Sequence, residues 1–248
     1  MKNKTALITG ASRGIGAATA REFARLGANV MLSARSESDI VALAAEINAD
    51  GGKAAAVPCD VSDLSQVKAM VATCVSTFGS LDILVNNAGA IDPIERLDNS
   101  DPIGWAKVID INVNGVYYGM REALPHMKSG GTILTIGSGA GTNALEAWSA
   151  YCTSKAAVHH LNKCLDKEER ENGIRALVLS PGTVATEMQR AIKDSGINPV
   201  SQINWSDHVP PEWPAKTLAW MCTADADDWL GEVISLREDA IRKRVGLI

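Results

Sequence analysis

The stretch Thr9-Gly10-Ala11-Ser12-Arg13-Gly14-Ile15-Gly16 decides the fold of this chain. It connects a short apolar run, Thr5–Thr9, to a segment with helical spacing, Ala17–Leu26, which predicts a buried strand followed by a helix. Glycine permits positive φ and lets backbone N–H groups approach a pyrophosphate at a helix N-terminus. A tight turn without a ligand would also use glycine, and the spacing G-x-x-x-G-x-G differs from the G-x-G-x-x-G of other dinucleotide folds. The position after the first strand favours dinucleotide binding.

Predicted strands and helices alternate along the rest of the chain. The further predicted strands are Asn29–Ala34, Ala54–Val57, Leu81–Val85, Thr132–Ile136, Ile174–Leu179 and about Glu232–Leu236. The further predicted helices are Ser38–Ala49, a helix capped by Ser62 or Asp63 that reaches about Phe78, Pro102–Met127 and Ala150–Glu171.

This alternation predicts an α/β fold with one doubly wound Rossmann domain over residues 1–248. We expect a seven-stranded parallel sheet with helices on both faces and a ligand site beyond the carboxyl ends of the strands. The segment at about 186–214 breaks the alternation and is predicted to form a lid over that site.

Composition excludes several classes of protein. Of the 248 residues, 46% are hydrophobic and 21% are charged, as in globular proteins and unlike disordered ones. A net charge of −5 argues against a nucleic-acid partner, and no apolar run could span a membrane. The N-terminus lacks a signal-peptide core and the five cysteines are scattered, so we expect a cytoplasmic location. The four histidines form no metal-binding motif, and no metal is expected.

The end of the second predicted strand indicates the cofactor. A carboxylate there would bind the ribose 2′-hydroxyl of NAD and repel a 2′-phosphate, but the sequence reads Ser33-Ala34-Arg35. Arg35 and Arg13 can both face a 2′-phosphate, which a guanidinium binds through two charge-assisted hydrogen bonds. The missing acid and the two cations together favour NADP(H), although Arg35 could also be an ordinary surface charge.

Tyr151 and Lys155 indicate the chemistry. They lie four residues apart and therefore share one face of a predicted helix. A free tyrosine has a pKa of about 10, and a neighbouring cation lowers that pKa by favouring the phenolate. Ser138 follows a predicted strand, where its hydroxyl can hydrogen-bond a carbonyl oxygen beside the tyrosine. An amphipathic helix would also explain Tyr-x-x-x-Lys, but Ser138 favours catalysis.

With these motifs in this order, the chain resembles the short-chain dehydrogenase/reductase family, closely over about Lys4–Gly182. The matching motifs are Thr9-Gly10-x-x-x-Gly14-Ile15-Gly16, Asp60, Asn86-Asn87-Ala88-Gly89, Asn112, Ser138, Tyr151-x-x-x-Lys155, and Pro181-Gly182 with Thr186. The resemblance implies that Tyr151 is the general acid/base and that Ser138 positions the substrate oxygen. It also implies that Lys155 binds the nicotinamide ribose and lowers the tyrosine pKa, and that Asn112, rather than Asn114, holds a water for proton relay.

The same resemblance implies most of the cofactor contacts. Asp60 and Val61 would contact adenine, and Asn86 to Gly89 would support the adenosine ribose. The predicted cofactor-binding residues are Gly10, Ser12, Arg13, Gly14, Ile15, Gly16, Arg35, Asp60, Val61, Asn87, Ala88, Gly89, Tyr151, Lys155, Pro181, Gly182, Val184 and Thr186.

The C-terminus departs from the family pattern. Many members continue the last strand with Asp-Gly-Gly, whereas here it runs into a charged segment, Arg237–Ile248. The family tetramer uses this region at a subunit contact. We therefore expect a homo-oligomer, a tetramer or a dimer, and predict that Val245–Ile248 docks on the body or on a neighbouring subunit.

The residues around the predicted site suggest a mostly apolar pocket. Its predicted lining is Ile91, Ile94, Trp148, Met188, Ile192, Trp205 and Trp213, although ordinary core packing explains Trp148 equally well. Arg96 and Arg190 are candidate clamps for a substrate carboxylate. His159 and His160 are predicted to lie two helical turns beyond the chemistry.

The predicted function is an NADP(H)-dependent oxidoreductase that interconverts a ketone or aldehyde and a secondary or primary alcohol. One alternative is a 3-oxoacyl-acyl-carrier-protein reductase, against which the acidic stretch Lys167–Glu171 argues because that carrier is itself acidic. Another is an NDP-sugar epimerase or dehydratase, for which the chain is short. A catalytically silent NADPH-binding sensor or scaffold is the third.

Overall fold

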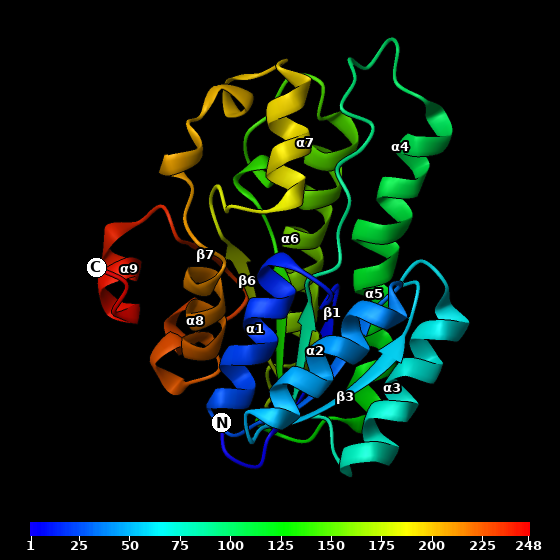
Figure 1. The fold of residues 1–248 in the computed structure, drawn as a ribbon, viewed down its shortest axis with the longest axis vertical. Helices are drawn as coiled ribbons and strands as arrows, with labels where there is room; N and C mark the ends of the chain where they lie inside the picture. Colours follow the sequence, from blue (N-terminus) through cyan, green and yellow to red (C-terminus); the bar gives the residue numbers. More distant parts are fainter.

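Seven parallel strands form the centre of the computed structural model, which describes residues 1–248 (Figure 1). The strands are β1 (Thr5–Thr9), β2 (Asn29–Ala34), β3 (Lys53–Pro58), β4 (Ile83–Asn86), β5 (Thr132–Ile136), β6 (Arg175–Ser180) and β7 (Val233–Ser235). Their order in the sheet is β3-β2-β1-β4-β5-β6-β7, and Ile8 of β1 pairs with Leu32 of β2 and Val85 of β4. The strand order reverses between β1 and β4, and a ligand crevice is expected beyond the carboxyl ends at that point. The predicted fold class is confirmed.

Helices cover both faces of the sheet. They are α1 (Gly14–Arg25), α2 (Glu37–Ala49), α3 (Leu64–Phe78), α4 (Pro102–Ile109), α5 (Gly115–Ala123), α6 (Ser149–Glu169), α7 (Glu187–Ser195), α8 (Glu212–Met221) and α9 (Asp239–Val245). Buried side chains of α1, α2 and α8 pack in one core with the sheet, and those of α3, α5 and α6 pack in a second core on its other face.

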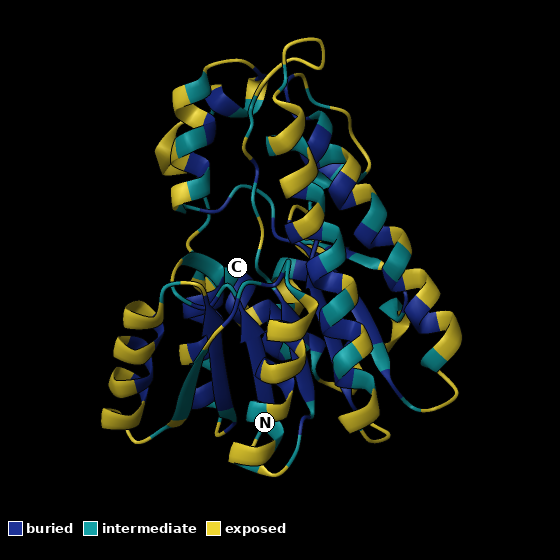
Figure 2. Cartoon of the chain, turned by 90° about the vertical axis from the view of Figure 1, so that its right-hand side faces the viewer, coloured by how far each residue is buried: buried dark blue, intermediate teal, exposed yellow.

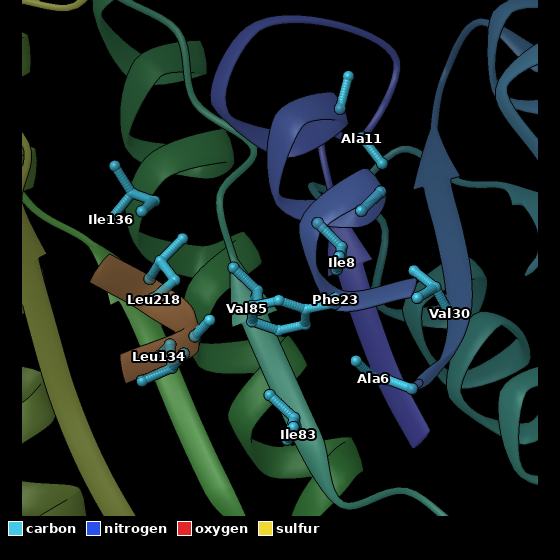
Figure 3. Packing of buried hydrophobic residues seen from close by; sticks show 14 of the residues in the cluster. Ala6, Ile8, Ala11, Phe23, Val30, Ile83, Val85, Leu134, Ile136 and Leu218 are labelled. Carbon is cyan, nitrogen blue, oxygen red and sulfur yellow. The ribbon is translucent and has the colours of Figure 1, made fainter. Parts of the chain in front are cut away.

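The two cores follow from the alternation of side chains along each strand. Ile8 of β1 contributes to the core beneath α1, whereas its neighbour Leu7 contributes to the opposite core. Phe23 of α1 is fully buried in the first core, beside Ile8 and Val85 (Figure 3). Because helices cover both sides, the central strands β1, β4 and β5 are buried along their whole length, whereas the edge strand β3 has no buried residue (Figure 2).

The predicted helix Pro102–Met127 is confirmed as a continuous helical run, but it is not regular throughout. It includes a π-helical segment, Asp110–Asn114, and its end is a 3₁₀ turn, Leu124–His126. Pro125 accounts for that turn because it lacks an N–H for the regular helical bond. The π-helical segment is a local widening of the helix, a feature that often marks functional sites. It contains Asn112.

The segment predicted as a lid forms α7 and two 3₁₀ turns, Pro199–Gln202 and Trp205–Asp207, before α8 begins at Glu212. Figure 1 shows α7 beyond the end of the sheet. At the C-terminus, Val245 and Leu247 pack against the core beneath α1, while Ile248 is exposed. The expected docking of this end is therefore on the chain's own body. None of the helices is both long enough and apolar enough to cross a lipid bilayer.

Candidate active site

The glycine-rich loop joins β1 to α1 and leaves the start of that helix open. Gly10 and Gly14 have φ of 63° and 56°, and a Cβ on Gly16 would lie 2.3 Å from the Gly10 carbonyl oxygen. The first turn of α1 contains no acidic residue, and the N-cap, Arg13, makes no capping hydrogen bond through its side chain. The free N–H groups and the helix dipole therefore form a site for an anion such as a pyrophosphate.

Asn87, at the end of β4, holds this loop in place. Its amide nitrogen donates to the carbonyl oxygens of Thr9 (2.9 Å) and Gly10 (3.0 Å). The hydroxyl of Thr9 in turn accepts the N–H groups of Asn87 and Ala88, both at 3.1 Å. Both amide hydrogens of Asn87 are used within the protein, so its side chain acts on the cofactor site by fixing the loop.

Two cations stand beside the loop without a partner. Arg13 and Arg35 are exposed, line the same groove and form no ion pair. Asp60, on the same groove, has its pKa lowered chiefly by the hydrogen bond from the Ser62 hydroxyl, with a smaller contribution from the charge of Arg35. The residues therefore fit an NADP(H) cofactor whose 2′-phosphate would lie near the two guanidinium groups.

Tyr151 and Lys155 lie on one face of α6 and both are buried. The Lys155 ammonium donates to the Ile136 carbonyl oxygen at 2.8 Å and lies 5.5 Å from the centre of the Tyr151 ring. Burial lowers the pKa of Lys155 to about 8. Burial raises the pKa of Tyr151 to about 12, while a hydrogen bond with Ser138 acts in the opposite direction. The protein's own groups therefore do not lower the pKa of Tyr151 as expected, because the effect of burial exceeds that of Ser138.

Ser138 starts a 3₁₀ turn after β5 and makes two contacts that fix its position. Its hydroxyl oxygen accepts the Ala140 N–H at 3.1 Å, which leaves the hydroxyl proton free to be donated. Its backbone N–H donates to Nε2 of His159 at 3.3 Å. His159 and His160 were interpreted as packing or surface residues, and His159 is indeed buried while His160 is exposed. The contact of His159 with the backbone of Ser138 was not predicted, because it forms where the turn after β5 packs against α6.

Asn112 is almost fully buried and joins three parts of the site. Its amide nitrogen donates to the Ala90 carbonyl oxygen (2.8 Å) and to the Ser154 hydroxyl (2.9 Å), and its Oδ1 accepts the Ala90 N–H (2.8 Å). Asn112 Oδ1 and Lys155 Nζ both approach Gly89, at 3.4 and 3.9 Å from the point that a Cβ would occupy. Asn114 instead donates to Asp110.

One groove, with a volume of about 1460 Å³, contains nearly all of the predicted site residues. The exceptions are Gly16 and Asn112, whose atoms do not line the groove. This volume exceeds that of an ordinary small-molecule pocket and suits a dinucleotide together with a substrate. Arg237 also lines the groove and was missed; the signal was the replacement of the family's Asp-Gly-Gly ending by a charged segment.

The part of the groove beside Tyr151 is apolar, and most of the residues predicted to line it lie there. Ile91, Ala140, Trp148, Tyr151 and Ile192 form a buried cluster, against which Ile94 and Met188 pack. Trp148 contacts Tyr151 edge to face, with ring centres 5.5 Å apart.

Two predicted tryptophans and two predicted arginines lie elsewhere. Trp205 is partly exposed and stacks on His208, and Trp213 belongs to α8 and packs against the core beneath α1. Arg96 pairs with Glu146 and Arg190 pairs with Glu187, so each of these guanidinium groups already has a carboxylate partner. Neither arginine lines the groove.

Comparisons with known proteins match this geometry. The family model for short chain dehydrogenases matches residues 4–196. A cyclohexanol dehydrogenase from an Acinetobacter species is 33% identical over 90% of this chain and 89% of its own length. A 3-oxoacyl-acyl-carrier-protein reductase from Staphylococcus aureus is 37% identical over 77% of this chain and 78% of its own. A solved short chain dehydrogenase from Burkholderia cenocepacia, in complex with NADP, superimposes with a TM-score of 0.84 at 30% identity and covers 94% of this chain and 96% of its own.

Proposed function

Because this chain belongs to the short-chain dehydrogenase family, we propose that it is an NADP(H)-dependent oxidoreductase. It would interconvert a ketone or aldehyde and the corresponding secondary or primary alcohol. The observation that carries the proposal is the convergence of Ser138, Tyr151 and Lys155 on the groove that also holds the open start of α1.

The side chains divide the acid–base work. When bound, the cofactor supplies a hydride to the carbonyl carbon, or accepts one in the reverse reaction. The free proton of the Ser138 hydroxyl is directed to the carbonyl oxygen, and Tyr151 transfers its proton to that oxygen as charge develops. The high pKa of Tyr151 in the protein keeps the phenol protonated at neutral pH, as a proton donor must be.

Lys155 and Asn112 would support the proton transfer. The ammonium of Lys155 donates one hydrogen to the Ile136 carbonyl oxygen, and its other two hydrogens can be donated to a ribose and a water. Asn112 donates both amide hydrogens, to the Ala90 carbonyl oxygen and the Ser154 hydroxyl. Its Oδ1 accepts the Ala90 N–H and has one lone pair left. That lone pair can hold the water that would link Lys155 to solvent.

We propose an apolar carbonyl compound as the substrate. The buried cluster around Trp148 and Ile192 supports this choice, and so does the similarity to a cyclohexanol dehydrogenase. The similarity to a 3-oxoacyl-acyl-carrier-protein reductase supports the alternative of an acyl thioester substrate. The exposed acidic residues at the end of α6 argue against an acidic carrier there. Turnover of cyclohexanone, but not of a 3-oxoacyl thioester, would separate the two.

Fluorescence titration with NADPH and with NADH tests the cofactor. We expect NADPH to bind at least about tenfold more tightly, and the Arg35→Ala variant to lose about 10- to 100-fold in NADPH affinity, since a hydrogen bond to a charged group contributes about 1.5–3 kcal/mol. NADH affinity should not change in that variant. Arg121→Ala is the matched control, because this exposed arginine on α5 pairs with Glu122 outside the groove. Tighter binding of NADH would contradict the assignment.

We further propose a homo-oligomer in the cytoplasm. Large apolar side chains are exposed before α4 and on α4 and α5: Leu97 and Ile103 are 73% and 80% exposed, and Tyr117 is 46% exposed. A second copy of the chain would cover them, which light scattering would show as a dimer or tetramer mass. All five cysteines are free, which suits a reducing compartment.

A further inference from the structure

His159 lies in direct contact with the loop that carries the proposed catalytic serine. The ring is 8% exposed and sits between two glycines of the segment Gly137-Ser138-Gly139-Ala140-Gly141. A Cβ on Gly137 would lie 2.4 Å from its Nε2, and one on Gly141 would lie 2.5 Å from its Cε1. A Cβ on Gly139 would meet nothing within 4 Å. Two of the three glycines therefore make room for this imidazole.

The direction of this hydrogen bond fixes the tautomer of His159. The Ser138 N–H is the donor, so Nε2 must present a lone pair and the ring hydrogen must reside on Nδ1. A protonated ring would point an N–H at another N–H and lose the bond. Burial lowers the pKa of His159 to about 4, and the positive charges of Lys155 and Lys163 act in the same direction. The ring is thus neutral throughout the physiological pH range.

His159 also completes a row of contacts between α6 and the end of β5. Tyr151, Lys155 and His159 are spaced by four residues and share one face of the helix. Lys155 binds the Ile136 carbonyl, and His159 binds the N–H of Ser138, two residues later. The Ser138 hydroxyl lies near the Tyr151 phenol, whose pKa it lowers against the larger effect of burial. The row therefore sets the distance between the serine hydroxyl and the tyrosine.

We propose that His159 is a positioning residue, which holds the backbone of Ser138 so that its hydroxyl stays directed at the oxygen to which Tyr151 transfers a proton. This inference rests on the proposed function, because it assigns His159 a purpose only if Ser138 and Tyr151 carry out carbonyl chemistry. His159 itself touches neither the substrate nor the cofactor in this scheme.

Three variants test the proposal. His159→Leu removes the acceptor and keeps an apolar side chain, and His159→Gln offers an amide oxygen near the place of Nε2. His160→Gln changes the exposed neighbouring histidine and is the control. With NADPH and cyclohexanone we expect kcat to fall about 10- to 100-fold in the Leu variant, to recover to within about fivefold of wild type in the Gln variant, and to stay unchanged in the control. The dissociation constant of NADPH should change less than twofold in all three.

A measurement without substrate examines the contact itself. Nitrogen NMR of the wild-type imidazole should show Nδ1 protonated and Nε2 unprotonated from pH 8 down to about pH 5. A protonated Nε2 would overturn the contact. An unchanged kcat in the Leu variant, or a parallel loss of kcat and NADPH binding that Gln does not rescue, would overturn the positioning role. Wild-type protein that binds NADPH but reduces no carbonyl compound would refute the proposed function and the purpose of His159 with it, while the NMR result would still report on the contact.

Discussion

The two sides of the groove position their side chains in different ways. On the side formed by β5 and α6, Lys155, Ser138 and His159 each bind a backbone group, so β5 and the turn that follows it fix their positions. On the side formed by α7, Ile192 contributes only apolar contacts. Buried polar atoms without a partner occur on both sides, at the amide nitrogen of Gln189 on α7 and at the indole nitrogen of Trp148 at the start of α6. Under the proposed function, we expect the β5–α6 side to determine the reaction and the α7 side to determine which molecules fit.

The largest effect should come from Tyr151→Phe, on the fixed side. We expect kcat to fall by about 10²- to 10⁴-fold, because general acid–base catalysis contributes about that much. The NADPH dissociation constant should change less than about threefold, since the ring and its packing against Trp148 remain. Steady-state kinetics and fluorescence titration measure the two quantities.

Tyr117→Phe is the matched control, because Tyr117 is an exposed tyrosine on α5 outside the groove. Retention of full turnover by the Tyr151 variant would show that the β5–α6 side does not determine the reaction.

An intermediate effect should appear in the dependence of stability on pH. The pKa of His159 is lowered to about 4 in the folded protein, whereas it is about 6.5 in an unfolded chain. Between these values the unfolded state binds more protons, so the free energy of unfolding decreases as the pH falls from about 6.5 to 4. The contribution is about 2 kcal/mol, after an allowance for partial access of solvent to the ring.

Urea denaturation across this range should give a flatter profile for His159→Gln than for the wild type or for His160→Gln. Asp63, whose pKa is lowered to about 2 chiefly by the Ser65 hydroxyl, contributes only at lower pH. Equal slopes in all three proteins would mean that the ring accepts a proton freely in the folded state.

The smallest effect should come from Ile192→Ala, on the α7 side. Removing this buried side chain from the cluster around Trp148 should raise KM for cyclohexanone about three- to tenfold, by loss of about 1 kcal/mol of apolar contact. We expect kcat to change less than twofold. Ile197→Ala, at an exposed position just after α7, should leave both parameters unchanged. A large fall in kcat would show that the α7 side also affects the reaction itself.

Most of the fold could be predicted from local patterns, and three strands agree to the residue. They are short apolar runs bounded by turn residues, so that composition and length both indicate a strand: Thr5–Thr9, Asn29–Ala34 and Thr132–Ile136. The interruption at Asp110–Asn114 was not predictable in this way, because it depends on bonds from Asn112 to Ala90 and Ser154, which lie far away in the sequence.

The site shows the same division between local and distant information. The loop motif and the spacing of Tyr151 and Lys155 are local, and the structure brings them to one groove. The contact of His159 depends on the chain's return from β5 to α6, which no local pattern encodes. Trp205 and Trp213 were misplaced because an apolar residue in an irregular segment does not reveal which face it covers.

The π-helical segment also constrains the length of the chain. It inserts extra backbone between α4 and α5, and each residue of an ordinary helix turns the chain by about 100°. Removal of one residue from Asp110–Asn114 would allow an ordinary α-helix with α4 and α5 still in register, but it would remove the widening at which Asn112 contacts Ala90 and Ser154. Loops of this molecule can gain or lose residues, whereas this segment must keep its count.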